Sequence, residues 1–514
     1  MVRARWRFSR WIPLVSGMML EICGGSIYIT GLYNTDLKHR FFPGSDGQER
    51  IEQLVFACNL GNWLPAAGFF LDSRIGGARN TAAIAALLTL IGYLGVWAWS
   101  RRSIQPAFWQ VWVFWFIWGH GSGWFDNAAM TIAVRNFPQH RGRSVALMKS
   151  FYGLSGSILT QVYNLFFFEA TSDFLLFLGT AIAALGLACA QLLWLVPPSR
   201  LDDQDGPTWR LDMGLRLVMT LAVLLLAFGF ARVWWPDGRL TVNIGAFVSV
   251  IVTTGLLPLL MIRGTWSSQD PLLDAEQVGR SDGLAGADVG AGLPLSKALR
   301  MPELWLLLLI GFVGMGSGLV VLNNAGQMVD SFGPDAKATT MFVSLISIAN
   351  CFGRITFGLV PDLFSHVPRP LFCAANVVIM GGAQSLLAIG GKPAFFAGGI
   401  ITGFSYGGFW TLMPTLVVEI FGTSTFATLY NFQSLAVSAS SLTFSTFLAG
   451  HLYDREAILH PAAAGGCSGP TCYRTTCLVM VAACAVGFFA SLMLLRIMKR
   501  HVRSSSAGLS LAVT

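Results

Sequence analysis

Long apolar runs follow one another along almost the whole chain, and short polar segments separate them. An α-helix needs about 20 mostly apolar residues to cross the hydrocarbon core of a bilayer. By this measure we expect fourteen membrane-spanning helices, near residues 11–33, 51–71, 80–99, 107–134, 144–167, 173–195, 213–235, 240–262, 303–328, 338–360, 370–390, 393–418, 426–450 and 475–497. The runs therefore predict an all-α, multi-pass membrane protein.

The longest polar interruptions divide the predicted helices into groups of six, two and six. They predict a six-helix bundle over 1–196, a linker with two extra spans over 197–262 and a flexible cytosolic loop over 263–302, followed by a second six-helix bundle over 303–500 and a cytosolic tail over 501–514.

The composition agrees with this interpretation and excludes two other classes of protein. Hydrophobic residues make up 54% of the 514 residues and charged residues only 12%, whereas soluble domains average about 25% charged residues. A soluble globule would need more polar surface, and a disordered chain is poor in apolar residues.

The net charge of +8 has a membrane explanation. Of the 34 Lys and Arg residues, 20 lie in segments on the side of the N-terminus, 11 lie on the opposite side and three lie within spans. Positive residues favour the cytosolic side, so we expect both termini there, although Arg101 and Arg102 argue the other way. No nucleic-acid partner is needed to explain the charge.

A short pattern is repeated after the second helix of each six-helix group. A Gly, an Asp four residues later and an Arg seven residues after the Asp occur twice, as Gly68, Asp72 and Arg79 and as Gly358, Asp362 and Arg369. Transporters are often built from such repeats, so we interpret the two halves as a parallel repeat. Chance matching of residues common at loop ends is the alternative.

These Gly–Asp–Arg loops resemble the signature loop of the major facilitator superfamily. The resemblance implies that the Asp and Arg side chains lie at the inner mouth and hold one conformation closed. The first copy is one residue longer than the usual form, so either Arg74 or Arg79 is the equivalent of Arg369.

Longer stretches are similar to the nodulin-like branch of that superfamily, which is related to monocarboxylate and oxalate/formate carriers. They include Gly123-Trp-Phe-Asp-Asn-Ala, Val134-Arg-Asn-Phe-Pro, Met148-Lys-Ser-Phe-Tyr-Gly, Gly316-Ser-Gly-Leu-Val-Val-Leu-Asn-Asn-Ala-Gly-Gln327 and Thr428-Leu-Tyr-Asn-Phe432. The resemblance implies a monomeric solute transporter whose cavity is lined mainly by the first and fourth helices of each half.

Glu21 is the ionisable residue of the first helix, about 10 residues or roughly 15 Å into the span. A charged group at such depth costs roughly 2.5–3.5 kcal/mol on insertion scales. Loss of water disfavours a charged carboxylate, which suits a carboxyl group that carries a proton in a symporter. A packing role, with Glu21 hydrogen-bonded to a neighbouring helix, is the alternative.

The fourth helix carries His120, Asp126 and Asn127, and the fifth helix carries Lys149. We expect Asp126 to pair with Lys149, whose ammonium group is close enough to the inner end to reach water. This pair is either an inner-gate salt bridge or a cation that receives a carboxylate substrate. We expect His120 to be a packing residue with satisfied hydrogen bonds rather than a proton relay.

Amide side chains crowd the outer part of the first helix of the second half, at Asn323, Asn324 and Gln327. Their neutral donors and acceptors can recognise a small polar solute. Tyr406 indicates a tightly packed cavity helix. We expect Arg354 to form an ion pair with Asp362 at the inner mouth, with substrate binding as the alternative.

The loops contribute one candidate covalent link. Cys467 and Cys472 lie in an outer, non-cytosolic loop, where a disulfide can persist. The sequence contains no GxxxxGK[ST], HExxH or paired CxxC motif, so we expect no catalytic residues, no metal site and no cofactor.

Together these features predict a secondary transporter that moves a small organic anion, such as a monocarboxylate, by alternating access with a proton. A neutral or cationic solute, such as an amino acid, a sugar or a metal chelate, is the alternative cargo. A receptor or scaffold with the carrier fold is the alternative class, and the buried charges argue against it because a scaffold does not need them.

Overall fold

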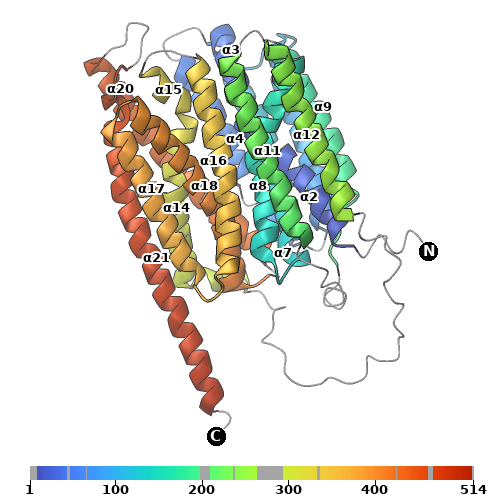
Figure 1. The fold of residues 1–514 in the computed structure, drawn as a ribbon, viewed down its shortest axis with the longest axis vertical. Coiled ribbons are helices and arrows are strands. Elements are labelled where there is room, and N and C mark those ends of the chain that lie inside the picture. Colours follow the sequence, from blue (N-terminus) through green and yellow to red (C-terminus); the bar gives the residue numbers. More distant parts are fainter. Residues whose placement is uncertain are drawn as a thin grey trace, which may run out of the picture.

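The computed structural model describes residues 9–42, 47–64, 66–73, 75–168, 170–196, 209–235, 238–262, 293–332, 336–423, 425–460 and 467–511, which are almost entirely helical (Figure 1). The predicted all-α, multi-pass architecture is confirmed. Most of the loop expected over 263–302 lies outside the described residues.

The helices of the first half are α2 (Trp11–Gly24), η1 (Gly25–Ile29), α3 (Gly31–Phe41), α4 (Gly47–Asn62), α5 (Ala66–Leu71), α6 (Ala78–Ser100), α7 (Phe108–Asn136), α8 (Arg141–Phe166) and α9 (Thr171–Ala190). The extra pair consists of α11 (Trp209–Trp234) and α12 (Arg239–Ile262). The second half comprises α13 (Leu295–Ala298), α14 (Pro302–Asn323), α15 (Ala325–Asp330), α16 (Ala336–Leu363), α17 (Arg369–Ile389), α18 (Lys392–Phe421), α19 (Phe426–Ser440), the π-helical η5 (Ser441–Ala449), α20 (Gly450–Leu459) and α21 (Thr471–Leu511).

Eleven helical segments in the described residues are long and apolar enough to cross a membrane. The expected spans 107–134, 144–167 and 393–418 are absent from these eleven, although they form the long helices α7, α8 and α18. These three helices are less apolar because they carry polar and small residues, and most of their side chains are buried inside the protein. These three helices therefore lie largely in the interior of the bundle.

Several expected spans are interrupted helices. The first changes from α2 to the 3₁₀ segment η1 at Gly25, where an added Cβ would lie 1.9 Å from Ser155 Oγ and 2.6 Å from Tyr152 O. Glycine at this position lets the break pack directly on α8. The ninth span is interrupted at Asn324, between α14 and α15.

The two halves meet along two seams. Helix α8 packs along α16, and α5 packs on α19. We call the end of the bundle that carries the loops after α5, α7, α16 and α18 the Asp72 end, and the opposite end the Cys467 end. The Asp72 end lies at the bottom of Figure 1.

Gly358 on α16 lies where α16 packs closely against α8. A Cβ on Gly358 would lie 2.3 Å from Ala146 Cβ and 2.8 Å from Gly142 O of α8. We expect Gly358→Ala to lower the free energy of unfolding by about 1–3 kcal/mol, the usual effect of overpacking. Gly382→Ala, on α17, is the matched control because no atom lies within 4 Å of the added methyl group, and it should be neutral or stabilising by up to about 1 kcal/mol. Thermal unfolding in detergent compares the two variants, and equal effects would contradict the packing described here.

Candidate functional site

Four ionisable side chains from four helices meet at one depth in the bundle. Glu21 on α2, Asp126 on α7, Lys149 on α8 and Arg354 on α16 are all buried. Each lies roughly 8–10 residues from the end of its helix at the Asp72 end, or about 12–15 Å at 1.5 Å per residue. Glu21 interacts electrostatically with the other three. We call these four residues the charge cluster.

Lys149 is held by an anion and by aromatic rings. Its Nζ donates a hydrogen bond to Asp126 Oδ1, and Tyr430 Oη donates to Asp126 Oδ2 at 3.1 Å. The same Nζ lies 5.1–5.4 Å from the ring centroids of Tyr152, Trp410 and Tyr430, an arrangement that favours a buried cation. The expected pair with Asp126 is present, but the expectation that Lys149 reaches water is wrong, since 1% of its side chain is exposed.

Arg354 is fully buried and is fixed by neutral oxygen atoms. Its Nε donates to Asn350 Oδ1 at 2.7 Å, one terminal nitrogen donates to Lys149 O, and the other donates to Tyr28 Oη at 3.3 Å. Its guanidinium carbon lies 5.5 Å from the centre of the Tyr152 ring. The contacts with Lys149, Tyr28 and Tyr152 join α16 to the first half.

The expected ion pair between Arg354 and Asp362 is wrong. The two residues are two helical turns apart on α16, and Arg354 is directed across the seam toward α8 and Tyr28. Asp362 instead accepts a hydrogen bond from Arg369 Nη2 at 2.8 Å. Arg354 therefore belongs to the charge cluster and not to the gate.

Glu21 is the fourth member of the charge cluster, and its carboxyl oxygens accept no hydrogen bond from the described residues. Both of its oxygens are buried and have no hydrogen-bond partner among the residues that the structure describes, and its neighbours include the Asp126 carboxylate. Two ionised carboxylates can only accept hydrogen bonds, whereas a proton on one supplies an O–H donor. A proton on the Glu21 carboxyl group would therefore supply a donor that the two ionised carboxylates lack.

A second set of contacts closes the Asp72 end, and it is formed twice. Asp72 Oδ2 accepts hydrogen bonds from the backbone N–H (3.0 Å) and the hydroxyl (2.9 Å) of Thr428, the third residue of α19. Asp362 Oδ2 accepts from the backbone N–H of Arg143, the third residue of α8, at 3.2 Å. Each aspartate thus caps a helix of the opposite half, where a negative charge is favoured by free N–H groups and the helix dipole.

The arginine partners of these aspartates agree only partly with expectation. Arg369 binds Asp362 and also Glu419 Oε2 at 3.0 Å. Arg79 does not bind Asp72 but hydrogen-bonds to Gln191, and Arg74 lies outside the described residues. Asp72 is bound by Arg135 Nη2 at 2.8 Å, a residue of the last turn of α7 that the loop pattern could not indicate.

Of the remaining predicted cavity residues, Asn127 and Tyr406 contact the opposite half, whereas His120 contacts its own half. Asn127 and Asn431 hydrogen-bond to each other across α7 and α19, and the hydroxyl group of Tyr406 is close to that of Tyr28. His120 Nδ1 hydrogen-bonds to Gly61 O at 2.8 Å and Nε2 accepts from Trp124, so both ring nitrogens have partners within the first half and His120 lies outside the cluster.

The three outer amides hydrogen-bond within the second half and do not reach the charge cluster. Asn323 and Asn324 donate to Ser445 Oγ at 3.1 and 3.2 Å, and Gln327 accepts from Tyr473. These contacts join α14 and α15 to η5 and α21. At the same end of the bundle, the sulfur atoms of Cys467 and Cys472 are joined as a disulfide.

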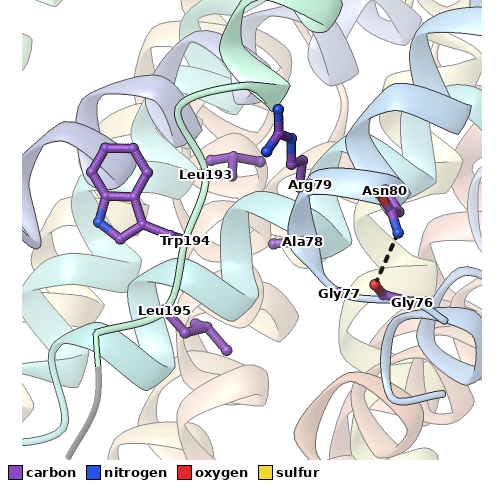
Figure 2. Close-up of a pocket in the computed structure, with 8 residues that line it drawn as sticks. All are labelled: Gly76, Gly77, Ala78, Arg79, Asn80, Leu193, Trp194 and Leu195. Atoms are coloured by element: carbon purple, nitrogen blue, oxygen red, sulfur yellow. Dashed lines mark hydrogen bonds between the residues drawn. The ribbon is translucent and has the colours of Figure 1, made fainter. Parts of the chain in front are cut away.

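A surface pocket of about 340 Å³ lies away from this site. It is formed where the loop before α6 meets the segment after α9, and it is lined by Gly76, Gly77, Ala78, Arg79, Asn80, Leu193, Trp194 and Leu195 (Figure 2). All of its lining residues belong to the first half, so it is not placed between the two halves as the charge cluster is.

The chain is similar to known protein families over both halves. Residues 10–261 match the family model described as Nodulin-like, and residues 288–504 match the model described as NFD4, C-terminal domain. Protein NUCLEAR FUSION DEFECTIVE 4 of Arabidopsis thaliana is 23% identical over 95% of this chain and 88% of its own length. The Oxalate:formate antiporter of Oxalobacter formigenes is 29% identical over 28% of this chain and 35% of its own length.

A solved transporter has a similar fold. The structure of the proton:xylose symporter XylE of the major facilitator superfamily superimposes with a TM-score of 0.57, covering 92% of this chain and 94% of the symporter, at 13% identity. At this identity the likeness concerns the fold alone.

The paired helix caps lead to a prediction for the Asp72 end. Asp72→Asn and Asp362→Asn each remove a charge that caps a helix of the other half, so each should favour opening by about 0.5–2 kcal/mol. Maleimide labelling of a cysteine at Ala427, which is fully buried behind this contact, should then be roughly 2- to 30-fold faster. Asp173→Asn is the control because Asp173 is an exposed residue paired with Arg101 at the other end. Unchanged labelling in both gate variants would contradict the assignment.

Proposed function

The chain belongs to the nodulin-like branch of the major facilitator superfamily, and we propose that it carries a small organic anion across the membrane together with a proton. The family and the fold identify the chain as an integral, multi-pass secondary transporter of that superfamily, a class of proteins that are not enzymes. The expected all-α fold of the superfamily is confirmed by the likeness to the xylose symporter.

The charge balance of the cluster supports an anion as cargo. Lys149 and Asp126 neutralise each other through their ion pair, which leaves Glu21 and Arg354. When Glu21 holds a proton, Arg354 is a buried positive charge without a counter-ion in the cluster. Such a charge is unfavourable in a low-dielectric interior, and a bound carboxylate would neutralise it.

The hydrogen bonds of Arg354 are the observation that carries the proposal. A guanidinium group has five N–H donors, and three acceptors in the described residues are bound to it, all of them uncharged: Asn350 Oδ1, Lys149 O and Tyr28 Oη. Two N–H groups thus stay available on a side chain whose orientation is already fixed. A carboxylate can accept both in the bidentate manner typical of arginine.

Coupling to a proton follows from the same balance. Without solute, an ionised Glu21 offsets the charge of Arg354, with which it interacts. When the carboxylate of a solute binds, a third negative charge in the cluster is avoided if Glu21 takes up a proton. Anion and proton then cross together and leave the net charge of the cluster unchanged.

In alternating access, the contacts of the charge cluster change first and the helix caps at the Asp72 end open afterwards. The Asp72 end is closed by the two helix caps, and we place this end in the cytosol, in accordance with the excess of Lys and Arg there. Binding of solute and proton at the charge cluster loosens contacts that cross the seams, among them those from Arg354 to Lys149 O and Tyr28. The caps at Asp72 and Asp362 can then break, and the halves rock to open the cytosolic side.

Uptake into proteoliposomes tests the proposal. Labelled acetate, lactate, oxalate, alanine, glucose and choline are offered to the purified full chain in proteoliposomes. Uptake is measured without a pH gradient and with a gradient that is acidic outside and alkaline inside. Uptake of a monoanion that increases with the gradient is expected. Uptake of the neutral or cationic solutes alone would contradict the proposed cargo, and binding without any uptake would favour a receptor.

The first variant is Arg354→Lys, which keeps the charge but loses the bidentate geometry. We expect it to lower the apparent affinity for the transported anion by roughly 10- to 100-fold, since hydrogen bonds to charged groups contribute about 1.5–3 kcal/mol. Lys297→Arg, a residue exposed at the surface of α13, is a control that should leave uptake unchanged. Wild-type affinity in Arg354→Lys would exclude Arg354 as the anion site.

The second variant is Glu21→Gln, which keeps the size of the side chain but cannot release a proton. We expect net uptake to lose its response to the pH gradient, while exchange of internal for external anion continues. His120→Gln should keep the response, because His120 is hydrogen-bonded within its own half. An unchanged gradient response in Glu21→Gln would exclude Glu21 as the proton site.

A further inference from the structure

The extra helices α11 and α12 lie against one seam of the molecule. Helix α11 contacts both α8 and α16, and α12 contacts α11, α8 and α2. In Figure 1, α11 is seen between α16 and α12. Lys149 and Arg354 lie on α8 and α16, so this is the seam whose helices carry both cations of the charge cluster.

Polar contacts fasten the pair to the first half at the Asp72 end. Asp212 Oδ1 forms an ion pair with Arg143 Nη1 of α8 at 3.3 Å, and the guanidinium carbon of Arg210 lies 5.2 Å from the ring centre of Trp11 on α2. Gly214 allows close packing, because a Cβ there would lie 2.9 Å from a methyl group of Leu147.

The pair is also fastened to the first half near the Cys467 end. Arg232 of α11 donates a hydrogen bond to Gln161 Oε1 of α8 at 2.5 Å, and Asn243 Nδ2 of α12 donates to Asn164 O of α8 at 3.3 Å. Polar contacts at both ends of α8 therefore restrain sliding of the pair along this helix.

The contact with the second half is of a different kind. Helix α11 also packs beside α16, but the polar contacts that Arg210, Asp212 and Arg232 of α11 form within the described part of the chain lead to α12 and α8. Two helices that pack without directional bonds can shift along each other without leaving a buried polar group unpaired.

This asymmetry has a consequence when the halves move. Separation of α8 and α16 would open the seam between the two helices that carry Lys149 and Arg354. Lipid entering this seam would bring hydrocarbon close to the two charged groups, which is unfavourable. A helix pair that covers the seam and stays on one half would keep lipid away from them throughout the cycle.

We propose that α11 and α12 form a lateral seal that moves as one body with the first half and slides over α16. The two moving units then contain eight and six membrane helices, in place of two equal bundles and an independent pair. This inference goes beyond the proposed cargo and holds for any solute.

Spin-label distances test the inference without any solute. Labels are placed at Val223 on α11, Leu187 on α9 and Val378 on α17, which are 52%, 39% and 57% exposed. Three pairs are measured by pulsed electron resonance in the parent chain and in the Asp72→Asn/Asp362→Asn variant. We expect the α11–α9 distance to stay constant while the α11–α17 distance changes together with the α9–α17 distance. An α11–α9 distance that changes with the gate, or an α11–α17 distance that does not, would overturn the proposal.

A second measurement does not depend on gate opening. Removing the ion pair of Asp212 and the hydrogen bond of Arg232 with Asp212→Asn/Arg232→Gln should broaden the α11–α9 distance distribution. Arg239→Gln is the matched control, since Arg239 is exposed at the start of α12, and it should leave the distribution unchanged. An unbroadened distribution in the tether variant would show that these contacts do not hold the pair on the first half.

Discussion

Burial of four ionisable groups inside an apolar helix bundle is the constraint on which the rest of the structure depends. Each charge must be offset within the protein, because the surrounding hydrocarbon offers no hydrogen bonds. Asp126 and Lys149 offset each other directly, and three aromatic rings complete the surroundings of the ammonium group. Arg354 and Glu21 are offset less directly, and this is where a solute anion and a proton can change the balance.

The same constraint joins the two halves. Arg354 donates across the seam to α8 and to Tyr28, and Tyr430 of α19 donates to Asp126 of α7. Both cross-seam contacts satisfy buried polar groups and also hold the halves together. A change of charge in the cluster is therefore also a change in the strength of the interface, which is the physical link between binding and movement that a carrier needs.

The Asp72 end shows how a repeated sequence pattern becomes a repeated interaction. Asp72 caps α19 and Asp362 caps α8, in each case at the third residue of the helix. The extra pair is connected to this gate through Arg143, whose backbone N–H binds Asp362 while its side chain binds Asp212. One residue of α8 thus contacts all three parts of the chain.

The sequence by itself determined the all-α membrane architecture, the repeated Asp loops and the pair between Asp126 and Lys149, because these follow from local runs, spacings or neighbouring helices. Tertiary structure decided what distant segments do together. Spacing along α16 suggested Asp362 as the partner of Arg354, but the orientation of α16 across the seam selects Tyr28 and Lys149 O. The aromatic residues around Lys149 and the Arg135 partner of Asp72 likewise come from helices far apart in sequence. In an apolar bundle the partner of a buried charge is whichever polar group the packing brings within reach, and packing is a property of the folded chain.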